Sequence, residues 1–276
     1  MMAARDIRGA RKPAVASVAQ RIIDGPGGDL TVRIYTPVGV GPFPLMMFFH
    51  GGCFVLCSLD SHDGLCRNLC SGAGCVVVSV DYRLAATRWT AAHAHVLHGD
   101  VSPLLLAGDS AGANFAAVTA LRIRDEGGPR LCGQMLIYPV TDHHSADTPS
   151  MRANAVGYGL TRAAMAHYWG HYSNHAGEIS HPHAAPLRAA SLAGLATHPA
   201  GHCAIRSTAR RRRILRRSTG ARRCDGDHEA LVRCQSWFLL FARRGRYCYR
   251  CRRPRMCLSA RAVRTLIDVS TPTCAA

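Results

Sequence analysis

The sequence predicts an α/β fold in which a mostly parallel central sheet carries flanking helices. Two apolar runs, at 45–49 and, with Ser79 as the one polar residue, at 75–80, are bounded by glycine or proline, as is typical of strands covered on both faces. Between them, the apolar residues of 61–70 follow helical spacing. Strands that alternate with helices form parallel sheets, because a parallel connection needs a long crossover segment.

The other elements extend this pattern in both directions along the chain. Alternating apolar residues predict an antiparallel strand at 30–35 that opens the sheet. A short apolar strand at 104–107 runs into a helix that reaches about residue 124, after which two glycines stop it. A further strand is expected at 134–138.

Composition divides the chain into a large domain and a basic tail. The chain has 276 residues, 48% of them hydrophobic, which is enough for one domain with a substantial core. Of its net charge of +17, residues 1–195 carry +2 and residues 196–276 carry +15. We therefore expect an α/β domain at 1–195, and an Arg/Cys-rich tail at 196–276 that is poorly ordered and supplies no well-packed strands.

Composition also bears on where the protein resides. No apolar run approaches the ~20 residues of a membrane span, and the N-terminus lacks the apolar block of a secretory signal. The 13 cysteines are then interpreted as reduced thiols. These features predict a cytoplasmic protein with no membrane span.

The segment Gly108-Asp109-Ser110-Ala111-Gly112 stands between a predicted strand and a predicted helix. A serine at such a sharp turn has an exposed hydroxyl, and the turn needs glycines because side chains there would clash. The free N–H groups of the following helix can stabilise developing negative charge. We interpret Ser110 as a nucleophile, with Gly108, Asp109 and Gly112 supporting it.

A second motif, His50-Gly51-Gly52-Cys53, directly follows the strand that ends at Phe49. Glycine-rich loops of this kind offer backbone N–H groups to the oxyanion of a tetrahedral intermediate. We expect Gly51, Gly52 and Ala111 to donate these hydrogen bonds. His50 is interpreted as a loop-fixing residue and not as the general base, because it precedes the nucleophile at a strand end.

Four motifs together resemble the hormone-sensitive-lipase family of esterases, within the α/β-hydrolase superfamily. They occur in the family's order: His50-Gly51-Gly52, Val78-Ser79-Val80-Asp81-Tyr82-Arg83-Leu84, Gly108-Asp109-Ser110-Ala111-Gly112 and Leu136-Ile137-Tyr138-Pro139. The resemblance covers about residues 18–195. It implies an α/β-hydrolase fold and hydrolysis of short or medium acyl esters by a Ser-His-Asp triad, without metal or cofactor. In that mechanism His takes the proton of the serine and Asp orients the imidazole.

The chain departs from this family at several positions. Cys53 stands where the family usually has a third glycine, and Cys57 where another glycine is common, so either can crowd the oxyanion loop. About a dozen residues are missing after Ala85, and the N-terminal lid segment is shortened. The family's catalytic Asp and His motifs are absent from the tail. Asp225, Asp227 and His228 are a poor substitute, because no apolar strand precedes them.

A change of reading frame accounts for the tail. When residues from about Ala196 onward are read one base later, permitted third bases give a strand, an Asp-Pro-Leu-Arg-Asp-Glu stretch, a helix and a further strand. In the same shifted frame, the codons of Arg206 and Ser207 contain an Asp codon, and those of Ser236 to Phe238 contain His-Gly. We expect the domain to be incomplete at its C-terminus for this reason.

A zinc site and a nucleic-acid site in the tail are both less favoured. Zinc needs four ligands at defined spacing, and Cys248, Cys251 and Cys257 supply three. The arginines follow no helical or strand period, which argues against nucleic-acid binding.

The sequence therefore predicts a serine carboxylester hydrolase by descent, acting on a small-molecule ester and impaired by the missing triad residues. A non-catalytic, hydrolase-like binding protein is the alternative, and a basic-tail nucleic-acid binder is less favoured.

Overall fold

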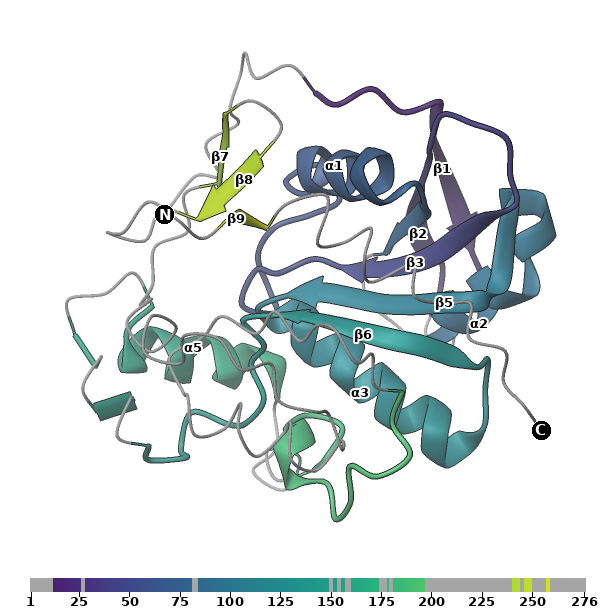
Figure 1. The fold of residues 1–276 in the computed structure, drawn as a ribbon. Helices are drawn as coiled ribbons and strands as arrows, with labels where there is room; N and C mark the ends of the chain where they lie inside the picture. Colours follow the sequence, from purple (N-terminus) through teal and green to yellow (C-terminus); the bar gives the residue numbers. More distant parts are fainter. Residues whose placement is uncertain are drawn as a thin grey trace, which may run out of the picture.

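The computed structural model is built around a six-stranded sheet (Figure 1). The strands are β1 (Ser17–Ile23), β2 (Leu30–Thr36), β3 (Phe43–Phe49), β4 (Val76–Val80), β5 (Gly99–Asp109) and β6 (Leu131–Ile137). Their order across the sheet is β1-β2-β4-β3-β5-β6. The structure describes residues 12–25, 28–80, 84–148, 151–152, 155–156, 160–173, 178, 181–196, 240–243, 246–249 and 257–258.

Four neighbouring strands, β4, β3, β5 and β6, pair in parallel, whereas β1 and β2 pair antiparallel at one end of the sheet. This confirms the expected parallel core with an antiparallel opening. Met47 of β3 lies between Val78 and Leu106 of its two neighbours, and all three side chains are fully buried. Interior strands of this kind are apolar at every position because helices cover both faces.

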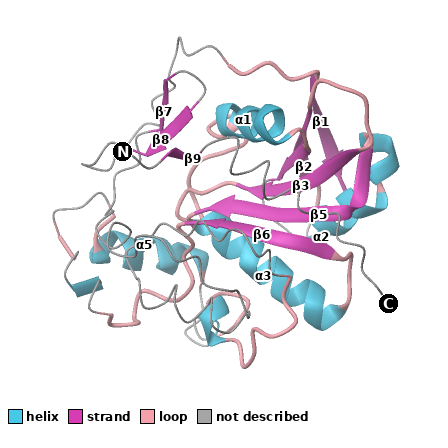
Figure 2. Ribbon diagram, in the orientation of Figure 1, coloured by secondary structure: helices cyan, strands magenta, loops and turns pink. Residues whose placement is uncertain are grey.

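Helices lie on the two faces of the sheet, as Figure 2 shows. Helix α1 (Asp63–Ala73) packs on one face through Leu65, Cys66, Leu69 and Cys70. Helix α3 (Ala111–Glu126) covers the other face with small residues, and α2 (Leu84–Ala92) and the short 3₁₀ helix η1 (Ala94–Leu97) pack there too. Helix α5 (Arg162–Tyr172) and the 3₁₀ helix η3 (Pro186–Arg188) follow β6 in the chain.

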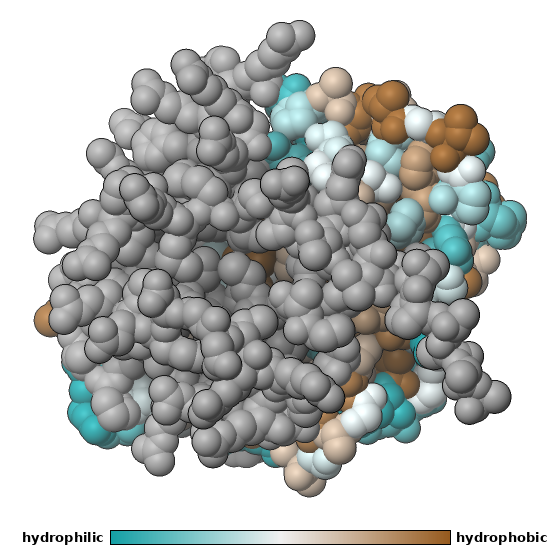
Figure 3. Space-filling view, in the orientation of Figure 1, coloured by the Kyte–Doolittle hydropathy of each residue, from teal (hydrophilic) through white to brown (hydrophobic). Residues whose placement is uncertain are grey.

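Two elements were not expected from the sequence. Strand β1 carries no apolar period because six of its seven residues are exposed, and it is held by pairing with β2. Exposed apolar residues, among them Val18 and Ile22, occur on it, and the space-filling view shows apolar residues at the surface on this side of the molecule (Figure 3). Helix α2 begins at Leu84 and runs across the position of the expected gap after Ala85.

The tail contributes three short strands, β7 (Leu240–Arg243), β8 (Arg246–Tyr249) and β9 (Cys257–Leu258). They form an antiparallel sheet of their own and leave β6 at the edge of the six-stranded sheet. The expectation that the tail supplies no well-packed strands stays a prediction. Among the described strands, β6 lies at one edge of the six-stranded sheet. The division of the chain at residue 195 stays a prediction.

In the part of the chain that the structure describes, none of the helices has the length and apolar character to cross a membrane.

Candidate active site

Ser110 stands at a sharp turn between β5 and α3. Its backbone has φ 55° and ψ −117°, a conformation that a residue with a Cβ rarely adopts. The turn is fixed by three backbone hydrogen bonds: the Ser110 N–H donates to Ile137 O at 2.9 Å, and the Ser110 carbonyl accepts from Asn114 N and Val140 N at 3.2 Å. Strain of this kind persists only where surrounding contacts over-determine the backbone.

The glycines on either side of Ser110 are required by close packing. A Cβ on Gly112 would lie 2.0 Å from the carbonyl oxygen of Phe49, at the end of β3. A Cβ on Gly108 would lie 2.5 Å from the backbone of Gly112. The turn therefore fits directly against the start of the loop that follows β3, which brings the two sequence motifs together.

Asn114, in the first turn of α3, was not singled out from the sequence. Its side-chain amide donates to Val140 O at 2.7 Å and to Ala184 O at 2.8 Å, and the residue is fully buried. These bonds tie the segments after β6 to the helix that begins at the nucleophile turn. A lone Asn inside an apolar helix was the available signal, since a buried amide needs partners.

The loop after β3, residues 50–62, is the predicted oxyanion loop, and we keep this name for it. Gly52 has φ +133°, and a Cβ there would lie 1.9 Å from Leu56 O, so the position requires glycine. The Gly52 carbonyl accepts from Leu56 N at 2.7 Å and Val55 N at 3.1 Å, which folds the loop back on itself. The N–H of Gly52, an expected oxyanion donor, belongs to the peptide that follows Gly51 in this loop.

The N–H of Gly51, which was expected to donate to the oxyanion, has another partner in this structure. Its N–H donates to the buried carboxylate of Asp109 at 2.8 Å. An N–H directed at a buried carboxylate is engaged in a strong, charge-assisted bond, so it is not available to an oxyanion in this conformation. A Cβ on Gly51 would lie 2.4 Å from Asp109 Oδ2, which explains the glycine by close approach instead. The sequence motif could not show which atom each N–H faces.

Three residues of the oxyanion loop that are not glycine have positive φ. They are Cys53 (φ 53°), Phe54 (φ 71°) and Cys57 (φ 70°). Two of these are the positions where the related family has glycine. The expected conflict at the cysteines therefore takes the form of backbone strain, which costs about 1–2 kcal/mol per residue in the left-handed region.

Asp109 is buried and accepts three hydrogen bonds. Besides Gly51 N, the donors are Tyr138 Oη at 2.9 Å and His62 Nε2 at 3.3 Å. Burial by itself raises the pKa of a carboxyl group, but the bonds from His62, Tyr138 and Gly51 outweigh it and lower the pKa of Asp109 below its usual value. The side chain is therefore an anion at neutral pH.

His50 and His62, the first and last residues of the oxyanion loop, lie next to one another. The rings are stacked with their centroids 5.4 Å apart, and His50 Nδ1 donates to the carbonyl of Gly51 at 2.9 Å. His50 thus binds within the loop itself. His62, at the end of the loop and just before α1, was missed from the sequence because no spacing rule connects it with a residue 47 positions away.

A small aromatic cluster joins the oxyanion loop to α5. Phe54 stacks on Tyr172 at 4.1 Å and contacts Trp169 of α5 at 5.0 Å. His143, in the segment after β6, packs edge-on against Trp169 at 4.9 Å. Burial lowers the pKa of His143 to about 4, helped by the neighbouring His144 and Arg188.

Asp225, Asp227 and His228, which the sequence offered only as a poor substitute for the missing triad residues, lie outside the described residues, and so do Asp81 and Tyr82 of the second motif. Within the described ranges there is no group of three or more His, Cys, Asp or Glu side chains that could hold a metal ion.

Comparison with known proteins gives one family model, described as the alpha/beta hydrolase fold, which matches residues 46–201. Among curated proteins, Esterase LipI of Mycobacterium tuberculosis is 40% identical over 206 residues, covering 68% of this chain and 63% of LipI. Carboxylic ester hydrolase LipN of the same organism is 38% identical, covering 63% of this chain and 51% of LipN. The chain thus spans less than two thirds of the length of these relatives.

The chain is also similar to solved structures of esterases. A thermophilic carboxylesterase cloned from a metagenomic library superposes with a TM-score of 0.65 at 33% identity, covering 67% of this chain and 68% of the other. A thermostable esterase from Pseudomonas putida has a TM-score of 0.62 at 38% identity, covering 65% and 61%.

Proposed function

Because this chain belongs to the family described by the alpha/beta hydrolase fold, whose model matches residues 46–201, we propose that it carries the nucleophile half of a serine carboxylester hydrolase site. The α/β-hydrolase fold expected from the sequence is confirmed. LipI, LipN and the Pseudomonas putida protein are esterases or carboxylic ester hydrolases, and the proposed substrate is accordingly a small ester.

One observation carries the proposal: Ser110 occupies a strained turn at φ 55° between β5 and the N-terminus of α3. In the proposed reaction its Oγ bonds to the acyl carbon as the C–O bond to the alcohol breaks, and water then hydrolyses the acyl-serine to release the acid and free Ser110. Gly52 N–H and Ala111 N–H are the proposed donors to the oxyanion. Gly51 is left out of this set because its N–H donates to Asp109.

The proposal includes weak turnover. A serine hydrolase needs a base to take the Ser110 proton and return it to the leaving alcohol. The sequence of the tail lacks the family's motifs for the Asp and the His that would do so. When triad members are removed, binding and the oxyanion hole leave a residual acceleration of about 10³–10⁴ over water. We propose this residual level for the chain, and full activity for a chain with residues from about 196 onward read in the other frame.

The test compares three proteins with p-nitrophenyl acetate: the full chain, its Ser110→Ala variant and a matched Ser191→Ala variant at an exposed serine. The expected result is slow hydrolysis by the full chain that both Ser110→Ala and Ser191→Ala retain, because binding and the oxyanion hole supply this residual rate. A chain with the frame and the gap after Ala85 repaired should gain several orders of magnitude, and this gain should be lost with Ser110→Ala and kept with Ser191→Ala. A repaired chain that folds but shows no serine-dependent hydrolysis would favour a binding protein instead.

A further inference from the structure

The two ends of the oxyanion loop meet at a single carboxylate oxygen. Asp109 Oδ1 accepts from Gly51 N–H at the start of the loop, at 2.8 Å, and from His62 Nε2 at its end, at 3.3 Å. The other oxygen, Oδ2, accepts from Tyr138 at 2.9 Å. Asp109 immediately precedes Ser110, so the carboxylate also links the loop to the nucleophile turn.

Hydrogen-bond geometry assigns two protons to His62. The Ser61 hydroxyl accepts from Ser58 N at 2.9 Å, donates to Ser58 O at 2.7 Å, and lies 2.9 Å from His62 Nδ1, and the Cys57 thiol is a further partner. Because a carbonyl oxygen can only accept, the hydroxyl proton is directed at Ser58, and His62 Nδ1 must donate to Ser61. On the opposite side His62 Nε2 faces a carboxylate, which also only accepts. Both ring nitrogens therefore donate, as in an imidazolium.

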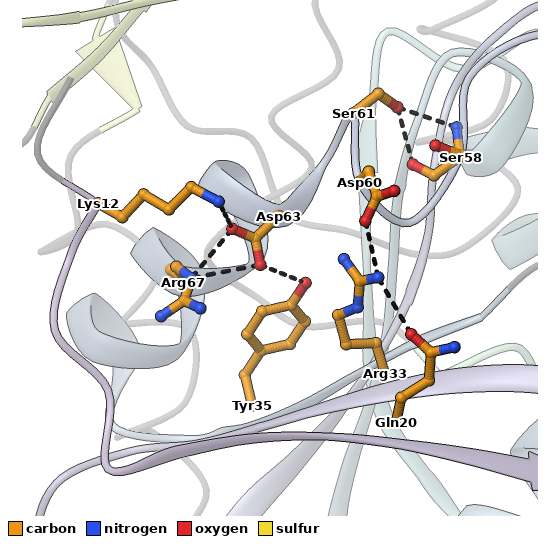
Figure 4. A network of polar contacts seen from close by, with 9 residues as sticks. All are labelled: Lys12, Gln20, Arg33, Tyr35, Ser58, Asp60, Ser61, Asp63 and Arg67. Carbon is orange, nitrogen blue, oxygen red and sulfur yellow. Dashed lines mark hydrogen bonds and ion pairs between the residues drawn. The ribbon is translucent and has the colours of Figure 1, made fainter. Parts of the chain in front are cut away.

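The stretch that carries His62 is itself tied to the sheet (Figure 4). Arg33 of β2 pairs with Asp60 at 2.7 Å, and Tyr35 of the same strand donates to Asp63 at 3.2 Å. Asp63 is paired further with Lys12 at 2.6 Å and with Arg67 at 3.1 Å. These bonds fix the backbone of 60–63, so the His62 ring has a rigid base from which to face Asp109.

We propose that Asp109 and His62 are positioning residues, whose pairing holds the start of the oxyanion loop and thereby directs the N–H of Gly52 at the site. This inference rests on the proposed function, because it assigns how one part of that site is held. The pairing, which we call the Asp109–His62 clamp, acts through Gly51: while Asp109 holds its N–H, the next peptide of the loop is fixed in direction. Neither residue contacts the reacting atoms in this assignment.

The clamp should respond to pH, because it depends on a proton of His62. When His62 loses a proton, Asp109 keeps the hydrogen bonds from Gly51 and Tyr138 but loses its cationic partner. A buried anion without its partner raises the free energy of the folded state. The titratable and charged groups that face His62 or its partners are Asp109, His50, Tyr138, Asp63 with Lys12 and Arg67, and Cys57 through its bond to Ser61.

The first experiment uses the full chain without substitution. Protein labelled with ¹⁵N-glycine and ring-labelled histidine is titrated by NMR from pH 5 to 9, with the Gly51 amide and the His62 ring followed together. The clamp requires the Gly51 amide signal to change together with the His62 ring signals. It also requires exchange of the Gly51 amide with solvent to rise about tenfold beyond the base-catalysed increase that a reference amide shows over the same pH steps. A Gly51 amide that does not change while His62 titrates overturns the proposal.

The second experiment separates positioning from folding. His62→Gln removes the cation, and the double variant His62→Gln with Asp109→Asn removes both charges and keeps groups able to hydrogen-bond. His93→Gln is the control, since His93 is a part-buried histidine whose Nδ1 donates to Trp89 O. Each is incubated with a p-nitrophenyl alkylphosphonate, which forms an O–P bond to Ser110 with release of p-nitrophenolate, and labelling is measured by mass spectrometry.

Single-turnover labelling should fall at least about tenfold in His62→Gln and in the double variant, and remain at the full-chain rate in His93→Gln. If all variants label as fast as the full chain, the clamp does not position the loop and the proposal is wrong. If the full chain itself never labels at Ser110, the proposed function fails, while the NMR titration still decides whether the clamp exists.

Discussion

The protein should be more stable to unfolding with the Cys57→Gly substitution than with Cys57→Ala. The Cys57 φ of 70° lies in the left-handed region, where a Cβ costs about 1–2 kcal/mol. Cys57→Ala and Cys57→Gly both remove the exposed thiol, so the difference between them isolates the Cβ. Glycine adds about 0.4–1 kcal/mol of chain entropy to the unfolded state, which offsets part of the gain. The free energy of unfolding should therefore be higher for Cys57→Gly by about 1 kcal/mol.

The measurement is thermal unfolding of both variants, followed by circular dichroism at one protein concentration. For a domain of this size, about 1 kcal/mol corresponds to a rise of roughly 2–4 °C in the unfolding midpoint. Cys132 in β6 provides the matched control, because it is also a free cysteine but has no positive φ. In a strand, glycine is weaker than alanine, so the order should reverse for Cys132→Gly and Cys132→Ala.

If Cys57→Gly melts at or below Cys57→Ala, the strain argument is refuted. If the same order appears at Cys132, the effect belongs to glycine in general and not to the loop conformation.

Two further predictions concern the nucleophile turn and the effect of acid. Gly112→Ala should lower the free energy of unfolding by about 1–3 kcal/mol in a denaturant titration, because its Cβ would lie 2.0 Å from Phe49 O. Gly170→Ala in α5 should be neutral or stabilising, since its Cβ meets open space. For His143, the folded pKa of about 4 lies below the unfolded value near 6.5, so the unfolded chain binds the proton first and stability falls as pH drops from about 6.5 towards 4. Between pH 7.5 and 5 the expected loss is about 2 kcal/mol, and His143→Gln should show a smaller loss over the same range in thermal scans.

The interior of the sheet could be predicted from the sequence because both faces of its strands are covered. The run 45–49 is apolar at every position and 75–80 at every position except Ser79, and they form β3 and β4 at the centre of the sheet. Strand β1 gave no such signal, because its stability comes from backbone pairing with β2 and not from buried side chains. Backbone pairing leaves little trace in residue type.

Some features of the site could likewise be predicted from residue type, whereas others could not. Glycines at 108, 52 and 112 could be predicted because steric exclusion depends on residue type, and each one proves to be required by close packing or a positive φ. The partner of the Gly51 N–H depends on the path of the chain through space, which brings Asp109 and His62 to it from two other segments. The bond from Gly51 N–H to Asp109 therefore argues against the donor role expected for Gly51 from the motif, and the motif alone could not reveal it.

Backbone strain and the Asp109–His62 clamp act on the same loop in opposite directions. Positive φ at Cys53, Phe54 and Cys57 raises the free energy of the loop, and the bonds to Asp109 from Gly51 and His62 hold it in that conformation. If the clamp is released, the loop can relax towards negative φ and the Cβ of Cys57 ceases to matter. The stabilisation by Cys57→Gly should then shrink from about 1 kcal/mol towards zero in a His62→Gln background. A double-mutant cycle measures this coupling, and strictly additive effects would mean that the loop keeps its strained shape without the clamp.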